Sequence, residues 1–477
     1  MSRWTPLALL LLIVGCPVDS PDDDDATAAD DDDSAGDDDD DSAGDDDDAG
    51  DDDDSTSACG VVPTVEDGAT PSRTVHVALD GDDGNDGSEG SPWGSLEFAA
   101  DQLEPGDALQ IHGGPWLGRT TLLDVRGTAS APIWIGGAPG EDVVIDADGA
   151  ETVMQIVRPT WLVLHDLTFR NSTINGLNID DGGAVADPDA ARHLLIRDLR
   201  IEDVGSGGNN DCLKLSGIDD YAVLDSEFVR CGSGGSAIDH VGCHDGVIAR
   251  NLIEDAGASG IQNKGGTTDV SIRWNRFVNA GARPINMGGS TGLQFFRPPV
   301  SEVDANAEAQ RIQVVGNLIE GGETAAAFVG CVDCVFAQNT VINPTNWVLR
   351  ILQETTSDAT YSFEAVHDGV VTNNLFWFAR GDLSTFVNIG PNTEPESFTF
   401  ATNLWFAHDG GDSTPSLPVT ETGGLVGQDP GFTTGWEIDA SSPAAGAGDA
   451  SSSQWLDADI TGACLPDPPM IGAWAPR

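Results

Sequence analysis

Basic residues are scarce in this sequence. Its 477 residues include 21 Lys and Arg against 80 Asp and Glu, which gives a formal net charge of −59 at pH 7. Bulk charge of this sign argues against binding to nucleic acid or to an anionic membrane surface. An acidic polysaccharide would bind only through a local basic patch or a bridging cation.

Segments long enough to span a membrane are also missing. The unbroken apolar run at residues 7–14 follows Arg3 and is too short to cross a bilayer. The four residues from Ile13 to Cys16 resemble the lipobox of bacterial lipoproteins. The resemblance implies that residues 1–15 are a signal peptide and that Cys16 is acylated and anchors the protein in the lipid bilayer. The protein would then lie in the cell envelope, at the outer membrane or cell surface of a bacterium; the alternative is an ordinary secretory signal.

Apolar residues are nearly absent from the stretch that follows. Residues 22–54 contain 21 aspartates in five blocks, separated by Ala, Ser, Thr and Gly. Such a segment cannot bury apolar surface and its charges repel one another. We therefore expect residues 16–60 to form a disordered tether that reaches roughly 100 Å or more when extended, at about 3.4 Å per residue. The tether accounts for 21 of the 59 net negative charges, which leaves about −38 on the rest.

Cysteines are few, and their number is odd once Cys16 is set apart. Export implies an oxidising compartment, in which disulfides form. The remaining seven cannot all pair within the chain, and the connectivity cannot be read from the sequence. Cys331 and Cys334 form one isolated pair without a second pair, so they do not predict a zinc site.

Helical periodicity is almost absent from residues 61–477, where a β pattern recurs instead. Short apolar strands flank a bend that carries a small residue, most often Asn. The nine bend positions are Leu167, Leu199, Ser226, Asn251, Asn275, Asn317, Asn339, Asn374 and Asn403. Their separations of 22 to 42 residues indicate a solenoid of β coils with insertions. Stacked Asn amides would form a ladder along the bend, and Asn tolerates the left-handed backbone conformation that we expect there.

The repeat predicts an all-β domain at residues 61–477. A propeller blade would need about 40 residues in four antiparallel strands, and a leucine-rich repeat would place Leu where this chain has Asn. The one helical pattern, at residues 93–103, puts Leu96, Ala99, Ala100 and Leu103 on one face. A short helix there would cap the open end of the first coil, as a solenoid requires.

Two terminal segments carry a family resemblance. The opening segment of the pectate-lyase-like right-handed parallel β-helix superfamily is similar to residues 75–87, 91–93, 99–100, 105–107 and 112–114 of this chain. Residues 429–432, 442–444 and 471–473 resemble its exit coil. The superfamily holds lyases, hydrolases, epimerases and adhesins, so the resemblance implies the fold and leaves the activity open.

A candidate site follows from four strands that align between residues 209 and 311. With their apolar residues inward, five polar side chains would form a stripe on one outer face: Lys214, Asp239, Gln262, Lys264 and Asn286. Directly after them comes the longest separation in the repeat, 42 residues. The loop that it contains, residues 288–299, would overhang the stripe, and loops on a rigid scaffold often carry function.

Part of this region is similar to the catalytic coil of the chondroitinase B and alginate lyase family. Residues 261–265, followed by 270–275, carry the likeness. It implies that Lys264 is the base of a β-elimination, and that Arg283, or else Arg297, neutralises the substrate carboxylate. The family's acidic calcium ligands have no counterpart in residues 256–260. Ca²⁺ is therefore an open option, with no certain cofactor.

The resulting hypothesis is a monomeric, envelope-anchored protein that binds polysaccharide. In its enzymatic form it is a lyase for a uronate-containing polymer, with Lys214, Asp239, Gln262 and Asn286 binding substrate. The alternative is a non-catalytic polysaccharide-binding or adhesin-like β-helix. Asp239 and His240 faintly resemble an epimerase motif that lacks its proline, and we expect His240 to point inward and to be hydrogen-bonded there. No set of acidic motifs indicates a hydrolase.

Overall fold

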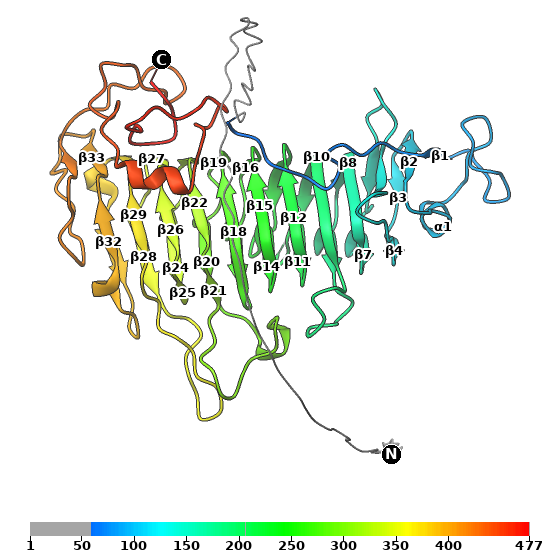
Figure 1. The fold of residues 1–477 in the computed structure, drawn as a ribbon, viewed down its shortest axis with the longest axis horizontal. Helices are drawn as coiled ribbons and strands as arrows, with labels where there is room; N and C mark the ends of the chain where they lie inside the picture. The colour runs from blue at the N-terminus through cyan, green and yellow to red at the C-terminus, as the bar shows by residue number, and fades with distance from the viewer. Residues whose placement is uncertain (1–58, 206, 477) are drawn as a thin grey trace, which may run out of the picture. The chain divides into compact units, whose positions relative to one another are not determined.

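Short strands with apolar inner side chains wind into a right-handed parallel β-helix (Figure 1). The computed structural model describes residues 59–205 and 207–476. The predicted signal peptide, Cys16 and nearly all of the aspartate-rich tether lie outside the described residues. No helix within the described ranges is long and apolar enough to cross a membrane.

Each coil contributes strands to three faces, and all strand pairs are parallel. The first face precedes the bend, the second follows it, and the third is a separate ten-stranded sheet. The third face consists of β4 (Thr120–Leu123), β7 (Thr152–Val157), β9 (Asn175–Asp180), β11 (Leu213–Ser216), β14 (Ser236–Val241), β17 (Ser259–Lys264), β20 (Arg283–Gly288), β24 (Ala326–Val329), β28 (Trp347–Leu352) and β31 (Thr385–Ile389).

The first and second faces are continuous through two long strands, β8 (Thr160–Arg170) and β10 (Arg192–Val204), which turn the bend without a break. The first face also holds β1 (Arg73–Ala78), β2 (Asp107–His112), β5 (Ile133–Gly137), β12 (Asp219–Leu224), β15 (His244–Ala249), β18 (Thr267–Arg273), β21 (Ala309–Gln310), β22 (Gln313–Val315), β25 (Cys331–Val332), β26 (Val335–Ala337), β29 (Val370–Thr372) and β32 (Thr399–Ala401). The second holds β3 (Trp116–Leu117), β6 (Val144–Asp146), β13 (Glu227–Cys231), β16 (Leu252–Glu254), β19 (Arg276–Val278), β23 (Leu318–Glu320), β27 (Thr340–Ile342), β30 (Leu375–Phe378), β33 (Leu404–Ala407) and β34 (Leu425–Val426).

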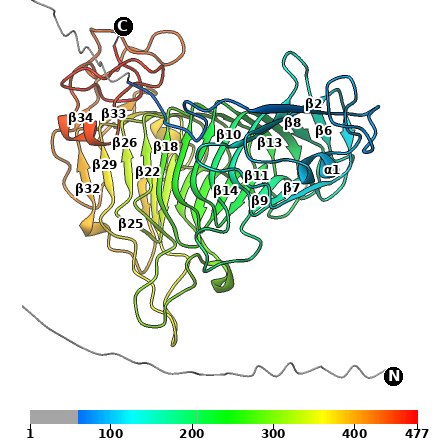
Figure 2. The ribbon, with the colours of Figure 1, turned by 45° about the vertical axis from the view of Figure 1, so that its right-hand side comes forward.

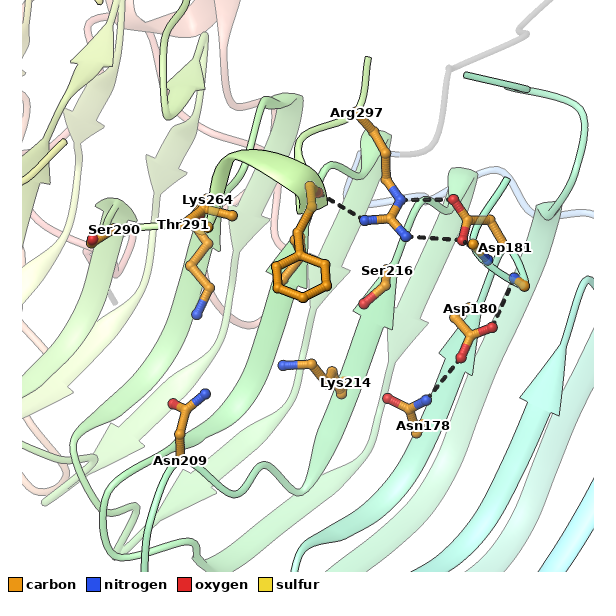
Figure 3. Close-up of a pocket in the computed structure, with 15 residues that line it drawn as sticks. Asn178, Asp180, Asp181, Asn209, Lys214, Ser216, Lys264, Ser290, Thr291 and Arg297 are labelled. Carbon is orange, nitrogen blue, oxygen red and sulfur yellow. Dashed lines mark hydrogen bonds and ion pairs between the residues drawn. The ribbon is translucent and has the colours of Figure 1, made fainter. Parts of the chain in front are cut away.

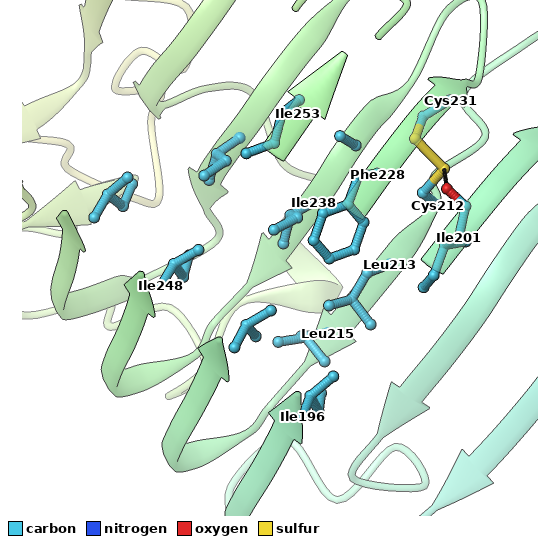
Figure 4. Packing of buried hydrophobic residues seen from close by; sticks show 14 of the residues in the cluster. Ile196, Ile201, Cys212, Leu213, Leu215, Phe228, Cys231, Ile238, Ile248 and Ile253 are labelled. Atoms are coloured by element: carbon cyan, nitrogen blue, oxygen red, sulfur yellow. Dashed lines mark hydrogen bonds between the residues drawn. A yellow bond between two sulfur atoms is a disulfide. The ribbon is translucent and has the colours of Figure 1, made fainter. Parts of the chain in front are cut away.

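Apolar side chains of the three faces meet inside the solenoid and form one continuous core (Figure 4). Phe228, Leu213 and Ile238 pack there beside the Cys212–Cys231 disulfide. The remaining core thiol, Cys243, is free and buried. Cys331 pairs with Cys334 in a disulfide.

The predicted amide ladder is present at the bend between the first and second faces. The Nδ2 atom of each ladder Asn donates to the Oδ1 atom of the next at 2.9–3.0 Å, in the order Asn251, Asn275, Asn317, Asn339, Asn374 and Asn403. The last amide donates to Glu421 Oε1 at 2.7 Å, and burial raises the pKa of that carboxyl. The ladder is therefore structural, and its end is closed by an acidic side chain.

The expected left-handed backbone at the ladder asparagines is wrong. The positive φ angles belong to the residue before each bend position, for example Arg250 (58°), Trp274 (58°) and Gln338 (53°). That residue turns the chain, so the Asn that follows can point inward, where its amide is shielded from water. Side-chain type at the turning position is accordingly variable.

Replacing Asn317 tests the ladder. Its amide donates to Ile272 O and accepts from the backbone and side chain of Asn275, all while fully buried. We expect Asn317→Ala to lower the free energy of unfolding by about 2–3 kcal/mol, because several buried groups lose their partners. Chemical denaturation measures this loss. Asn317→Ser should lose less, since Ser226 already makes the equivalent backbone contact at an earlier coil; equal losses would contradict the account.

The two ends of the solenoid are covered differently. The predicted capping helix is confirmed as α1 (Leu96–Asp101), with Leu96, Ala99 and Ala100 buried against the first coils. Four short 3₁₀ helices lie in loops: η1 (Leu293–Phe295), η2 (Arg380–Asp382), η3 (Pro395–Ser397) and η4 (Ala450–Gln454).

The predicted exit coil is wrong for residues 429–473. After β34 the chain forms no further coil and runs back along the flank of the solenoid, where Leu456 and Ala458 contact Val62 and Trp274 (Figure 2). The Cys59–Cys464 disulfide joins this segment to the N-terminal segment. Gly and Pro are frequent here and apolar alternation is lost, so the segment covers the flank without adding a strand layer.

Candidate functional site

An open cleft of about 620 Å³ lies over the third face, at the ends of β9, β11, β14 and β17 (Figure 3). The strands supply one wall, and the loop after β20 supplies the other. The lining residues are Asn178, Asp180, Asp181, Gly182, Gly183, Asn209, Lys214, Ser216, Val241, Lys264, Ser290, Thr291, Gly292, Phe295 and Arg297. The cleft is thus placed where the sequence predicted a stripe beneath an overhanging loop.

Parallel register sets the side chains of this face in rows. One outward row runs the length of the sheet: Thr121, Gln155, Asn178, Lys214, Asp239, Gln262, Asn286, Ala327, Arg350 and Asn388. Lys264 lies in the next row, aligned with Val241 and Ser216. The predicted stripe is therefore two rows. Within it Asp239 and Asn286 are buried, because longer side chains from neighbouring positions cover them.

A compact charge cluster forms the floor of the cleft. Lys214 Nζ lies 2.5 Å from Asp239 Oδ2 and 3.1 Å from Asp211 Oδ2. Lys264 Nζ lies 2.9 Å from the other oxygen of Asp239 and 3.4 Å from Gln262 Oε1. Both carboxylates are buried, whereas both ammonium groups border the cleft. A ligand in the cleft would therefore meet the lysines and not the aspartates.

The cluster shifts the ionisation of its members. Burial disfavours charge on Lys214, but the carboxylates of Asp239 and Asp211 outweigh it and raise the pKa of Lys214. Burial likewise opposes the charge of Asp239, yet Lys214 and Lys264 lower its pKa. Burial and the charge of Asp239 raise the pKa of Asp211. Lys214 is thus a fixed cation at neutral pH, held by two carboxylates where Lys264 has one.

Arg297 closes the cleft on the side of β9. Its Nε and Nη2 atoms donate to the two oxygens of Asp181 at 2.7 and 2.9 Å, and its Nη1 donates to Phe295 O at 2.8 Å. Both partners of the ion pair are buried (Figure 3). Because the guanidinium is fully engaged, Arg297 positions the overhanging loop and is poorly placed to neutralise a substrate.

The overhang is one wall made from two loops. Residues 289–308 and 353–365 are joined where the backbone N and the Nδ2 of Asn306 both donate to Ser362 O, at 2.8 and 2.9 Å, and where Phe296 packs edge-on against Phe363. Buried Glu308 accepts from Gly265 N and Thr291 N, both at 2.8 Å. Because this buried carboxylate binds both the end of β17 and the loop, it fixes the position of the loop relative to the two lysines.

Arg283 does not reach the cleft, contrary to the expectation that it would act beside Lys264. It stands at the start of β20, where Nη1 pairs with Glu354 Oε1 at 2.9 Å and contacts Asn286 Oδ1 at 3.3 Å. Arg283 is aligned with Ser259 at the start of the neighbouring strand, whereas the outward row of Gln262 and Asn286 lies three residues further along these strands. Sequence spacing placed it about one coil after Lys264 but could not give its position along the strand.

The structure also adds residues that the sequence did not single out. Asp180, Asp181 and Asn178 come from β9 and the turn after it, one coil before the predicted stripe. Asp180 accepts from Gln155, Asn178 and the backbone of Gly182, at 2.7 to 3.0 Å. The sequence offered one signal for these residues, the pair Asp180 and Asp181 at the end of the β9 segment. Strand ends on one face lie side by side, so this pair could have been placed next to the predicted stripe.

His240 points inward, as expected. It is fully buried under the charge cluster, in the row of Leu215 and Met287. Its polar neighbours are the Gln262 backbone and the Asn263 side chain, but within the described residues neither ring nitrogen makes a hydrogen bond of standard geometry. Burial lowers the pKa of His240 to about 4, so it is a neutral, inert side chain at pH 7.

This histidine predicts a pH-dependent stability. The folded protein resists protonation of His240 while the unfolded chain titrates near the ordinary value of 6.5. Stability is therefore greatest above pH 6.5, and we expect a loss of roughly 3 kcal/mol as the pH falls to about 4. Urea unfolding at a series of pH values measures it. His240→Leu should flatten the profile between pH 6.5 and 4, whereas His408→Gln, at an exposed position, should not; an unchanged profile in His240→Leu would refute the assignment.

The donor set does not suit a calcium ion. The buried carboxylates of Asp239 and Asp181 are bonded to lysine and arginine groups, and Asp211 contacts Lys214. No group of three or more His, Cys, Asp or Glu side chains with metal-binding geometry occurs in the described ranges. A hard cation prefers several free oxygen ligands, which this cleft does not offer.

The cleft chemistry consists of two ammonium groups, amides, hydroxyls and the half-buried carboxylate of Asp180, above a buried counter-ion. Glycoside hydrolysis uses a pair of accessible carboxylates, whereas Asp181 is buried against Arg297 and both Asp211 and Asp239 lie beneath Lys214. The arrangement can bind an anion, stabilise negative charge that develops on it, and accept a proton at Lys264 if that amine is released from Asp239.

Comparison with known proteins supports the fold. The chain resembles the crystal structure of pectate lyase Pel9A, with a TM-score of 0.51 and 15% sequence identity over 86% of this chain and 98% of that one. It resembles XylC in complex with xylose, with a TM-score of 0.52 and 11% identity over 84% and 98% of the two chains. An alginate lyase from Paenibacillus sp. str. FPU-7 overlaps less well, with a TM-score of 0.38, 15% identity, and coverage of 68% and 97%. No protein-family model and no curated protein sequence matches the chain. The predicted right-handed parallel β-helix is confirmed.

Proposed function

We propose that this protein is carbohydrate-active and cleaves a uronate-containing polysaccharide by β-elimination. The observation that carries the proposal is the pair of ammonium groups, Lys214 and Lys264, on either side of buried Asp239 in an open cleft. They are the only lysines of the chain, which otherwise carries a strong negative charge. Both lie where a polymer on the third face would pass.

The two lysines take different roles. Lys214, held by Asp239 and Asp211, is the fixed cation that binds the uronate carboxylate and stabilises the charge that grows on it. Lys264, held by Asp239 alone, is the base. Once Lys264 has separated from Asp239 and lost its own proton to water, its Nζ takes the proton from C5 of the uronate, the electron pair forms the C4–C5 double bond, and the C4–O bond breaks. The leaving oxygen takes a proton from water in the open cleft.

The shape of the face supports a polymeric substrate. The outward row that contains Lys214 and Asp239 continues over ten strands, which at about 4.8 Å per coil makes a track of roughly 40 Å. The likeness to a pectate lyase and to a xylose-binding β-helix agrees with a carbohydrate ligand.

The proposed placement is the cell envelope, with acylated Cys16 in the bilayer and residues 16–60 as a tether.

One observation favours the non-catalytic alternative, in which the cleft only binds polysaccharide. Lys264 pairs with Asp239 at 2.9 Å, and an ammonium group held in this way cannot act as a base until the pair opens. A bound uronate would have to separate Lys264 from Asp239 for the elimination to start. A protein that only binds would keep the pair intact.

Absorbance of the new double bond separates the two functions. The purified full chain would be incubated with a panel of acidic polysaccharides, with calcium and with chelator, while the ultraviolet absorbance of unsaturated sugar ends is followed. We expect a rise with one polyuronate, and we expect it to persist with chelator, because Asp181, Asp211 and Asp239 are engaged by cations and only Asp180 is not. No rise with any polymer, from a folded sample that still binds one of them, would replace the lyase by the binding function.

A further inference from the structure

A second cationic position lies on the third face, downstream of the cleft. Arg350 belongs to the same outward row as Lys214 and Asp239, three coils after Gln262. Three coil steps of about 4.8 Å put it roughly 14 Å further along the sheet, about the length of three sugar units. Asn286 and Ala327 lie in the row between them, and both are buried.

Arg350 is held in place by neutral groups. Its guanidinium stacks over the ring of Trp347 at 4.3 Å, and its Nε donates to Asn388 Oδ1 at 3.0 Å. No carboxylate in residues 59–205 or 207–476 lies within ion-pairing distance of it. Most arginines of this acidic chain do have such a partner, so the free guanidinium at a half-buried position is unusual.

The surroundings of Arg350 favour an anion. Burial, together with the positive charge of Arg283, lowers the pKa of Arg350. Arg283 stands in a neighbouring row of the same face, and Glu354, at the foot of the wall, neutralises it at 2.9 Å. Glu323 adds a second negative charge nearby but forms no ion pair with Arg350, and both terminal nitrogens of Arg350 are left to bind a ligand. A planar guanidinium matches the two oxygens of a carboxylate.

We propose that Arg350 forms a downstream subsite that binds the uronate carboxylate of an acidic polysaccharide chain whose other end occupies the lysine cleft. Trp347 supports the guanidinium from below and Asn388 sets its orientation. Arg350 is five coil steps, roughly 24 Å, from the row position of Lys214. The ligand must therefore span both positions and carry a second carboxylate about five sugars from the one that Lys214 binds. Short or neutral oligosaccharides do not use this subsite.

This inference rests on the proposed function only for the chemical class of the ligand, and it does not require turnover. Binding would be measured on the full-length Lys264→Ala protein by calorimetry, with galacturonate and alginate oligomers of increasing length. Carboxyl-reduced oligomers of the same lengths are the neutral probes. Elimination would be followed separately on protein with Lys264 intact.

Arg350→Gln is expected to weaken binding of long acidic oligomers about tenfold, which corresponds to the loss of one charge-assisted hydrogen-bonding group. Oligomers too short to span the two positions should bind unchanged, and the salt dependence of the long oligomers should become shallower. Arg350→Lys should restore part of the affinity because it restores the charge. Arg273→Gln is the matched control, since Arg273 also stacks on a tryptophan, Trp274, at 4.5 Å but lies on the first face.

The outcomes separate this subsite from the lyase. Length-dependent binding that Arg350→Gln abolishes, without any elimination, would support the subsite and remove the catalytic proposal. Elimination whose KM for long substrates is the same in Arg350→Gln and the parent would keep the lyase and overturn the subsite. Failure of every acidic oligomer to bind the folded protein at low salt would overturn the subsite as well.

Discussion

Lys264→Ala is expected to reduce the rate of elimination by about a hundredfold or more, because general base catalysis contributes a factor of this order. The fold should survive the change. Asp239, the buried partner of Lys264, keeps its ion pair with Lys214 at 2.5 Å, so no buried charge is left alone. Initial rates of ultraviolet absorbance and a thermal unfolding curve, taken on the same sample, measure the two effects.

A charge-conserving variant separates the base from a mere cation. Lys264→Arg keeps the positive charge beside Asp239, but an arginine does not give up its proton in a protein. We expect this variant to bind polyuronate nearly as the wild type does and to show no elimination. If Lys264→Arg retained activity, Lys264 would act through its charge, and the base would have to be sought elsewhere in the cleft.

Asp239→Ala is expected to destabilise the protein by about 3–5 kcal/mol, the range seen when one partner of a buried ion pair is removed. Two ammonium groups, Lys214 and Lys264, would then face each other with only Asp211 near them. Urea denaturation at pH 7 gives the change in the free energy of unfolding. The same variant should also bind polyuronate less well, since the lysines would separate.

Two matched variants give the control for this loss. Asp239→Asn keeps the shape and one acceptor oxygen, but it removes the charge and turns an amide donor toward one of the two lysines, so it should recover a minor part of the lost stability. The double variant Asp239→Asn, Lys264→Gln removes one charge of each sign and should be more stable than Asp239→Asn alone. The stability loss of the double variant would be compared with the sum of the losses of Asp239→Asn and Lys264→Gln measured separately. If the losses simply add, Asp239, Lys214 and Lys264 do not act as one unit.

The sequence alone determined the architecture of this protein. The recurring bend at Asn251, Asn275 and Asn317 indicates stacked coils, because only a repeat of that kind satisfies buried amides with one another. The apolar stripe through Leu96 and Ala99 indicates the cap. These features are local and periodic, so they can be read from spacing, and their register places Lys214, Asp239 and Gln262 in one row.

The long-range partners were decided only by the tertiary structure. Asp181 meets Arg297 across 116 residues of chain, and Cys59 meets Cys464 across 405. Arg283 is turned to Glu354 and away from Lys264. No periodicity encodes these contacts, because they depend on where irregular loops and the C-terminal segment return to the solenoid. Whether a polar side chain of the stripe faces a ligand or is covered follows from those loops, since the β coil sets the direction of each side chain while its neighbours in space set its exposure.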